Sequence, residues 1–260
     1  MTSPPIIAVD DVRKSFGGLT ALNGCSLSVA EGSITGLIGP NGAGKTTLFN
    51  IMAGAIRADS GQIRIADISV NGQNTHVLFH RGLVRTFQVP AGFPRLTVRE
   101  NLMVVPAGQA GETLTRSWFD WPRVRAREAE VRGKADEVLE FLDLTGVAEI
   151  SARQLSGGQK KLLELGRTMM TDARIVLLDE PGAGVNRSLL KRITGAIRSL
   201  NSERGYTFCI IEHDMDLIAE LCDPVIVMAQ GRVLAEGTLG DVRANPEVLD
   251  AYFGGGAPAS

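Results

Sequence analysis

Residues 39–46 have the types and the spacing of a phosphate-binding loop. The segment reads Gly39-Pro40-Asn41-Gly42-Ala43-Gly44-Lys45-Thr46 and matches the pattern GxxxxGK[ST] at every position. Glycines let successive backbone N–H groups converge on phosphate oxygens, and a helix N-terminus adds partial positive charge. Lys45 would supply a charge to the β- and γ-phosphates, and the Thr46 hydroxyl can bind Mg²⁺. An apolar strand before the loop and a helix after it disfavour the alternative, a chance glycine-rich turn.

Two acidic residues follow the apolar segment 175–178. Ligands of open α/β sheets bind at the carboxyl ends of the strands, which is where these acids are expected. Asp179 is predicted to hold Mg²⁺, directly or through water. Glu180 is predicted to polarise the water that attacks a γ-phosphate. A solvated acidic turn is the alternative, which the phosphate loop in the same chain disfavours.

His213 follows a second apolar segment, 207–212. At a strand end it could contact the γ-phosphate and orient the attacking water, whereas a core or surface histidine is the alternative. His76 and His80 have no such context, so no functional role is expected for either.

A second helix start able to bind an anion is expected at residues 155–159. Ser156 is a suitable N-cap, Gly157 and Gly158 leave backbone amides uncovered, and Gln159 follows. An ordinary capped helix has the same pattern. Because one nucleotide already has its phosphate loop, this second helix start either binds another ligand or completes a site on a neighbouring chain.

The elements that must position these residues follow from hydrophobic patterning. Strands are expected at 6–9, 25–29, 33–38 and 62–65, and a helix at 46–55. The pattern is helical from about 96 to 167, with helices at 123–142 and 157–170. Strands at 174–178, 207–212, 224–228 and 232–235 then alternate with helices at 187–200 and 215–221. This alternation predicts an α/β core with a mainly parallel sheet.

The composition argues against several classes of protein. The chain has 260 residues, 27 basic and 29 acidic, for a net charge of −2, which argues against an electrostatic nucleic-acid binder. Its three cysteines lack CxxC spacing, so a disulfide framework or zinc site is not expected, and a reducing compartment fits. Neither a signal peptide nor an apolar run of ~18 residues is visible, so no membrane span is expected.

Taken together, these motifs closely resemble the ATP-binding subunits of ABC transporters over about residues 6–253. The resemblance implies a P-loop NTPase of the ABC ATPase fold: a mainly parallel core sheet, an N-terminal antiparallel β-subdomain and an inserted α-helical subdomain. We expect a single domain over 1–260. Residues 1–89 and 171–253 would form the ATP-binding core with the β-subdomain, about 90–170 the helical subdomain with the signature motif, and 254–260 a flexible tail.

The resemblance also implies that two subunits enclose two ATP molecules with Mg²⁺. Nucleotide-binding residues would be Phe16, Gly39, Asn41, Gly42, Ala43, Gly44, Lys45, Thr46 and Thr47. The other subunit would contribute Ser156, Gly157, Gly158 and Gln159 to the γ-phosphate. Metal ligands would be Thr46, Gln88 and Asp179, and catalytic residues Glu180, His213 and Gln88.

Some of these positions keep alternatives or depart from the family pattern. Phe16 sits where the family has an aromatic ring stacked on adenine, and a core phenylalanine is its alternative. Many members have Asp where this chain has Asn186, which puts a charge-based role there in doubt. Trp118 and Trp121 could contact a membrane subunit or anchor a loop onto their own domain, and the second is favoured.

A narrower resemblance is to the ATPases of branched-chain amino-acid importers, carried by segments 17–22, 184–186 and 211–215. It implies a second ATPase subunit, identical or related, integral membrane permeases, a periplasmic or extracellular solute-binding protein, and no nucleic acid. The chain would be cytoplasmic, peripheral on the cytoplasmic face of the inner membrane. Alternatives are a urea or amide importer, a lipopolysaccharide exporter, or a soluble non-transport ABC ATPase. A degenerate regulatory subunit and a GTPase fit less well.

Overall fold

The protein is described by a computed structural model covering residues 5–86, 92–106 and 121–253. The chain divides into two compact units. The first contains residues 1–88, 173–183 and 197–260, and the second contains residues 89–172 and 184–196. Each unit is described by itself below.

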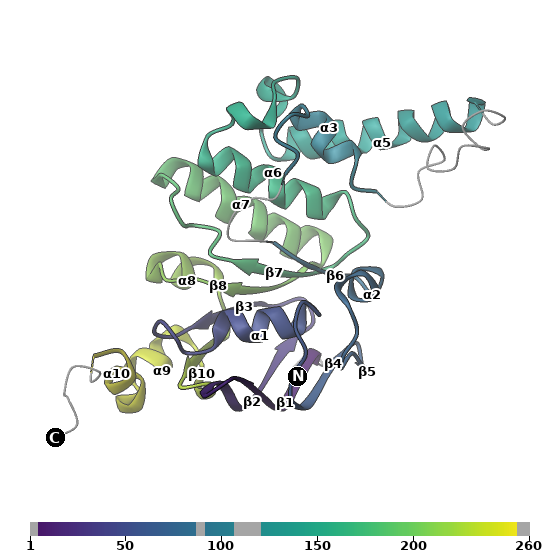
Figure 1. The fold of residues 1–260 in the computed structure, drawn as a ribbon. Coiled ribbons are helices and arrows are strands. Elements are labelled where there is room, and N and C mark those ends of the chain that lie inside the picture. Colours follow the sequence, from purple (N-terminus) through teal and green to yellow (C-terminus); the bar gives the residue numbers. More distant parts are fainter. Residues whose placement is uncertain (1–4, 87–91, 107–120, 254–260) are drawn as a thin grey trace. The chain divides into compact units, whose positions relative to one another are not determined.

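The first unit contains an antiparallel sheet near the N-terminus (Figure 1). Its strands lie in the order β2 (Leu19–Ala30), β1 (Pro5–Phe16), β4 (Ser60–Ile65) and β5 (Ile68–Ser69). Strand β1 pairs antiparallel with both β2 and β4. Alternate residues such as Ile7 and Val9 of β1 are buried, which is the period expected for a sheet with one face on the core.

The second sheet of this unit carries the predicted phosphate chemistry. Its order is β10 (Arg232–Gly237), β9 (Val225–Ala229), β3 (Ile34–Ile38), β8 (Thr207–Ile211), β7 (Ile175–Asp179) and β6 (Leu83–Arg85). Strands β9 to β6 are parallel, and β10 is antiparallel to β9. Every residue of β3, β7 and β8 is buried, as expected for strands covered on both faces.

The first unit also contains five whole helices and the C-terminal part of α7 (Arg187–Arg204). The whole helices are α1 (Lys45–Met52), α2 (Thr75–His80), α8 (Met215–Leu221), α9 (Leu239–Ala244) and α10 (Pro246–Phe253) among the described residues. The buried side chains of α1, including Leu48, Phe49 and Met52, share one hydrophobic core with residues of both sheets. Helix α1, which begins directly after the phosphate loop, is therefore held in place by packing against both sheets.

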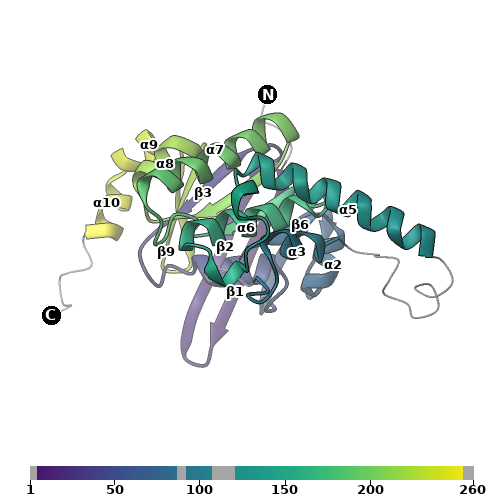
Figure 2. The ribbon, with the colours of Figure 1, turned by 90° about the horizontal axis from the view of Figure 1, so that it is seen from above.

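The second unit is helical. It contains α3 (Val98–Met103), α5 (Trp121–Phe141), α6 (Gly157–Met169), the short 3₁₀ turns η2 (Thr145–Val147) and η3 (Ala152–Gln154), and the first part of α7 (Arg187–Arg204). Figure 2 shows α5 as one continuous helix. The apolar positions that predicted this helix are buried: Val131, Ala135, Val138, Leu139 and Leu142.

The predicted α/β class with a mainly parallel sheet, an antiparallel N-terminal sheet and a helical insertion is confirmed. Several short elements went unpredicted, among them α2, β6, α9 and α10, and α3 lies in the stretch 96–167 that was expected to be helical but received no bounds of its own. Helices α3 and α9 have six residues each, too few to establish a period of 3.6. Both begin with a capping box, Thr97 with Glu100 and Thr238 with Asp241, which was a readable helix-start signal.

We expect Leu139→Ala to destabilise the second unit by about 2–5 kcal/mol, because it removes buried methyl groups from α5 and leaves a cavity. Urea denaturation followed by circular dichroism would measure the change. The neighbouring exposed Glu140→Ala on the same helix is the control and should change stability by less than about 0.5 kcal/mol. Equal effects of both substitutions would contradict the packing assigned to α5.

Candidate nucleotide-binding and catalytic site

The predicted phosphate loop joins the C-terminal end of β3 to the start of α1. Gly44 is the N-cap residue of α1, and no side chain caps this helix. The first backbone amides of α1 are therefore left without a capping side chain, as an anion site at a helix N-terminus requires. Asn41, Gly42 and Thr46 are exposed, so the outer surface of the loop and the Thr46 hydroxyl are open to a ligand.

Two glycines of the loop are required for steric reasons. Gly39 has φ +148°, and a Cβ there would lie 2.1 Å from the Met228 carbonyl oxygen. Gly44 has φ +99°, and a Cβ there would lie 2.5 Å from the Ala21 carbonyl oxygen. The loop path is thus set by close backbone approach of β9 and β2, which only glycine permits.

Lys45 lies inside the loop and is buried. Its Nζ donates to the carbonyl oxygens of Gly39 at 2.7 Å and Pro40 at 3.1 Å. Burial lowers the pKa of the Lys45 amine, and the carboxylates of Glu180 and Asp179 oppose that shift. The structure therefore brings the predicted phosphate-binding lysine and both predicted acids into one electrostatic neighbourhood.

Asp179, the last residue of β7, is 5 % exposed and forms a buried ion pair. Its Oδ2 accepts a hydrogen bond of 2.7 Å from Arg85 Nη2 on β6. Arg85 Nη1 also donates to Asn50 Oδ1 on α1, at 2.5 Å. Sequence reasoning missed Arg85 and Asn50, because no motif in the chain indicated that a cation from β6 would neutralise the predicted metal ligand.

Glu180 and His213 are brought into contact. His213 Nε2 lies 3.2 Å from Glu180 Oε1. Both side chains are partly exposed, the histidine at 47 % and the glutamate at 21 %, so water and a ligand can reach the pair. Glu180 has φ +50°, a left-handed conformation that is uncommon for a residue with a Cβ. Such strain is frequent where a side chain is aimed for function.

A buried carboxylate beneath this pair was not predicted. Glu212, directly after β8, is 3 % exposed. Its oxygens accept hydrogen bonds from the backbone amides of Gly182, His213 and Asp214. The sequence does show an acidic residue at the end of an apolar strand, directly before His213. It does not show that the hydrogen-bond donors to this carboxylate are backbone amides, because every residue type except proline carries one.

Ser156 is the N-cap of α6, as predicted. Ser156 Oγ accepts from the Gln159 amide at 3.3 Å, and the Gln159 side chain accepts from the Ser156 amide at 3.0 Å. This reciprocal pair is a capping box. Ser156 and Gly157 are exposed, so this helix start is accessible.

Gly158 has a packing role that the sequence did not predict. It is buried, and a Cβ there would lie 2.0 Å from Leu189 Cδ2 of α7. Asn186, whose role was in doubt, caps α7: its Oδ1 accepts from the Leu189 amide at 3.0 Å and from Ser188 Oγ at 2.9 Å. Asparagine fulfils this capping role without a charge.

Phe16, at the end of β1, is 49 % exposed. This exposure excludes the core phenylalanine that was its alternative and leaves a ring face open to a planar ligand. Lys14 Nζ lies 5.3 Å from the ring centroid, and the same amine pairs with Asp59 at 2.7 Å. Gln88 and Trp118, the tail after 253 and the side chain of Trp121 lie outside the part of the chain that the structure describes.

The three cysteines do not suit thiolate chemistry. Cys25, Cys209 and Cys222 are free and buried. Burial raises the pKa of the Cys25 thiol to about 11 and is the main cause that raises those of Cys209 and Cys222 to about 12.

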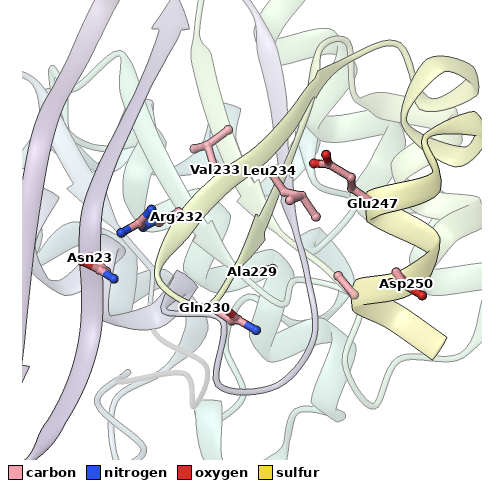
Figure 3. A pocket seen from close by; sticks show the side chains of 9 residues that line it. Asn23, Ala229, Gln230, Arg232, Val233, Leu234, Glu247 and Asp250 are labelled. Atoms are coloured by element: carbon pink, nitrogen blue, oxygen red, sulfur yellow. The ribbon is translucent and has the colours of Figure 1, made fainter. Parts of the chain in front are cut away.

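A cavity of about 750 Å³ is lined by Asn23 of β2, by residues of β9 and β10 and by residues of α10 (Figure 3). Its walls include the turn between β9 and β10. In that turn the Gly231 amide donates to the Ala43 carbonyl at 3.1 Å, and the Gly231 carbonyl accepts from the Asn23 amide at 2.9 Å. From α10, the Tyr252 hydroxyl interacts with the Gly39 backbone, which opposes the rise in its pKa caused by burial. The C-terminal segment thus braces the phosphate loop.

Comparison with known families gives two matches. The model for the ABC transporter family matches residues 22–183. The model for the C-terminal part of the branched-chain amino acid ATP-binding cassette transporter matches residues 232–258, which include β10, α9 and α10. Together these matches include the phosphate loop, Asp179 and Glu180 at the end of β7, and α10, which contacts the loop through Tyr252.

Known proteins similar to this chain over nearly all of its length include two transporter subunits. The high-affinity branched-chain amino acid transport ATP-binding protein BraF of Pseudomonas aeruginosa is 40% identical over 97% of this chain and 99% of its own. The probable branched-chain amino acid transport ATP-binding protein LivG of Archaeoglobus fulgidus is 41% identical over 96% and 95%.

Solved structures similar to this chain are also cassettes of ABC transporters. The ADP conformation of MJ1267, an ATP-binding cassette of an ABC transporter, matches with a TM-score of 0.83 and 37% identity over 97% of this chain and 100% of that one. The dimeric structure of MJ0796, a bacterial ABC transporter cassette, matches with a TM-score of 0.74 and 26% identity over 90% and 98%.

Proposed function

The chain belongs to the ABC transporter family, and we propose that it is the ATP-hydrolysing subunit that energises import of branched-chain amino acids through separate membrane subunits. The observation that carries the ATPase assignment is the convergence of Lys45, Asp179, Glu180 and His213 at one sheet edge. The solute class is supported by the names of the relatives and by the match of residues 232–258.

ATP fits the phosphate loop. Backbone amides of the loop and of the uncapped start of α1 would bind the β- and γ-phosphates, with Thr47 among the residues beside them. The Lys45 amine, held by two backbone carbonyls, would exchange these for phosphate oxygens. Phe16 would stack on the adenine through its exposed ring face.

Magnesium ion, when bound, would neutralise charge on the phosphates. Thr46, Asp179 and Gln88 are the residues proposed to hold it. An exposed hydroxyl and a carboxylate at a strand end are suitable hard oxygen ligands. Asp179 is paired with Arg85, so this pair would have to adjust for direct binding, whereas binding through water leaves it intact.

Glu180 is proposed as the general base and His213 as the group that orients water and the γ-phosphate. Hydrolysis needs a base within hydrogen-bond reach of water, and Glu180 is partly exposed at the strand end. Its contact with His213 Nε2 would restrain the carboxylate, so that the two side chains act as a pair.

A second ATPase subunit, identical or related, is proposed to complete each site. Ser156, Gly157, Gly158 and Gln159 at the start of α6 would bind the γ-phosphate of ATP held by the other subunit. The similar cassette MJ0796 has a dimeric structure, which supports this arrangement.

Integral membrane permeases and a periplasmic or extracellular solute-binding protein are the remaining proposed partners. In the described residues no helix is both long and apolar enough to cross a bilayer. The proposal places the chain on the cytoplasmic face of the membrane, attached through the permeases, because ABC transporter subunits of this kind couple ATP hydrolysis to transport through membrane proteins.

Glu180→Gln should lower ATP turnover by about 10²-fold or more, because an amide cannot accept the proton of the attacking water. ATP should still bind, so the variant should accumulate as an ATP-bound dimer with Mg²⁺. Phosphate release and light scattering after size exclusion measure the two effects. Glu203→Gln, an exposed glutamate on α7, is the matched control. Normal turnover in Glu180→Gln would remove the general base from the proposal.

The solute class can be tested in cells in which the gene for this chain carries Lys45→Ala. Uptake of radiolabelled leucine, isoleucine and valine should fall by about tenfold or more, because the lysine supplies charge to the phosphates. Urea uptake should not change. Lys191→Ala, an exposed lysine of α7, is the control. Loss of urea uptake with normal leucine uptake would favour the amide importer instead.

A further inference from the structure

Glu212 is a buried carboxylate for which the proposed reaction has no direct use. It is 3 % exposed, directly after β8, and precedes His213 in sequence. Among residues 5–86, 92–106 and 121–253, no lysine, arginine or histidine forms an ion pair with it. A buried carboxylate is costly unless other groups stabilise it, so the groups that do so indicate what it is for.

Those groups are backbone amides from two different loops. One oxygen of Glu212, Oε1, accepts from the Gly182 amide at 2.5 Å. The other, Oε2, accepts from the His213 amide at 2.9 Å and lies 3.4 Å from the Asp214 amide. Gly182 is two residues after Glu180, so a single carboxylate joins the loop of the proposed base to the turn of the proposed histidine.

The loop of Glu180 needs such a restraint. Glu180 has φ +50°, and its amide donates to the Ile211 carbonyl at 2.9 Å. Pro181 follows, which has no N–H to donate. The Gly182 amide is therefore the first donor after Glu180, and Glu212 is its acceptor. The left-handed conformation of Glu180 is thus held between the end of β8 and Glu212.

We propose that Glu212 is a positioning residue for ATP hydrolysis, which holds Glu180 and His213 in the mutual geometry that places the base against water. This inference rests on the proposed ATPase function. Glu212 does not reach a ligand itself, because it is buried and its oxygens face backbone amides. It acts by fixing the main chain on both sides of the Glu180–His213 contact of 3.2 Å.

A carboxylate suits this role better than an amide. Both oxygens of Glu212 accept, and all three facing groups are N–H donors. In Glu212→Gln one acceptor becomes an NH₂ group, which must face an N–H donor. The shape is kept, so one of the two loops should lose its anchor while the hydrophobic packing is retained.

The experiment compares Glu212→Gln with the wild-type chain in ATP binding and in turnover. We expect kcat to fall about tenfold, because misplacing a general base loses much of its contribution, while the Kd for ATP stays within about twofold. Glu212→Ala, which removes both acceptors, should lower kcat further. If Glu212→Ala fails to fold, Glu212→Gln alone decides the matter.

Thr35→Val is the control for a loss of stability alone. Thr35 is fully buried on β3, and its hydroxyl bonds Ser33 at 2.9 Å, away from the Glu180 and His213 loops. Unchanged kcat in Glu212→Gln would overturn the proposal. So would a fall in kcat of the same size in Thr35→Val at a comparable loss of thermal stability. Absence of ATP turnover in the wild-type chain, even with its partner subunit, would overturn the proposed function itself.

Discussion

The parallel direction of strands β9, β3, β8, β7 and β6 is the constraint on which the site depends. Parallel strands all end at one edge of the sheet, so the residues that follow them meet there. The phosphate loop follows β3, Glu212 follows β8, and Asp179 ends β7. Lys45 and Asp179, which are 134 positions apart in the chain (179 − 45), become neighbours without any local signal that they should.

Gathering charged groups at a buried edge creates a problem that the structure solves in three ways. Asp179 pairs with Arg85, Lys45 donates to backbone carbonyls, and Glu212 accepts from backbone amides. Buried charges are tolerated only when paired or hydrogen-bonded. These three sets of bonds differ in whether a bound ligand could replace them. Lys45 can exchange carbonyls for phosphate oxygens, whereas Glu212 is enclosed by its own main chain and is suited to hold a geometry.

Sequence predicted the elements with strong periodicity and the motifs with fixed spacing. The phosphate loop, the two acids at the end of β7, the buried face of α5 and the Ser156 cap could all be predicted locally, because each depends on residues close together in the chain. Arg85, Asn50 and Glu212 could not, because their partners come from other strands and loops. Asn186 shows the same limit: the family pattern raised a question about charge, whereas the structure shows a capping role, in which Asn186 Oδ1 accepts from the Leu189 amide.

The two helix starts proposed to bind phosphate differ in a way that bears on the order of events. Helix α1 has no side-chain cap, so its amides are available to a phosphate without breaking a bond. Helix α6 has a capping box in which Ser156 and Gln159 satisfy each other, so binding an anion there must compete with those bonds. A cap contributes about 0.5–2 kcal/mol, and charge-assisted hydrogen bonds are roughly twice as strong as neutral ones, so a γ-phosphate can displace the capping bonds. We infer that α1 binds the nucleotide first and that α6 exchanges its capping bonds only when a partner subunit presents a phosphate already held by its own loop.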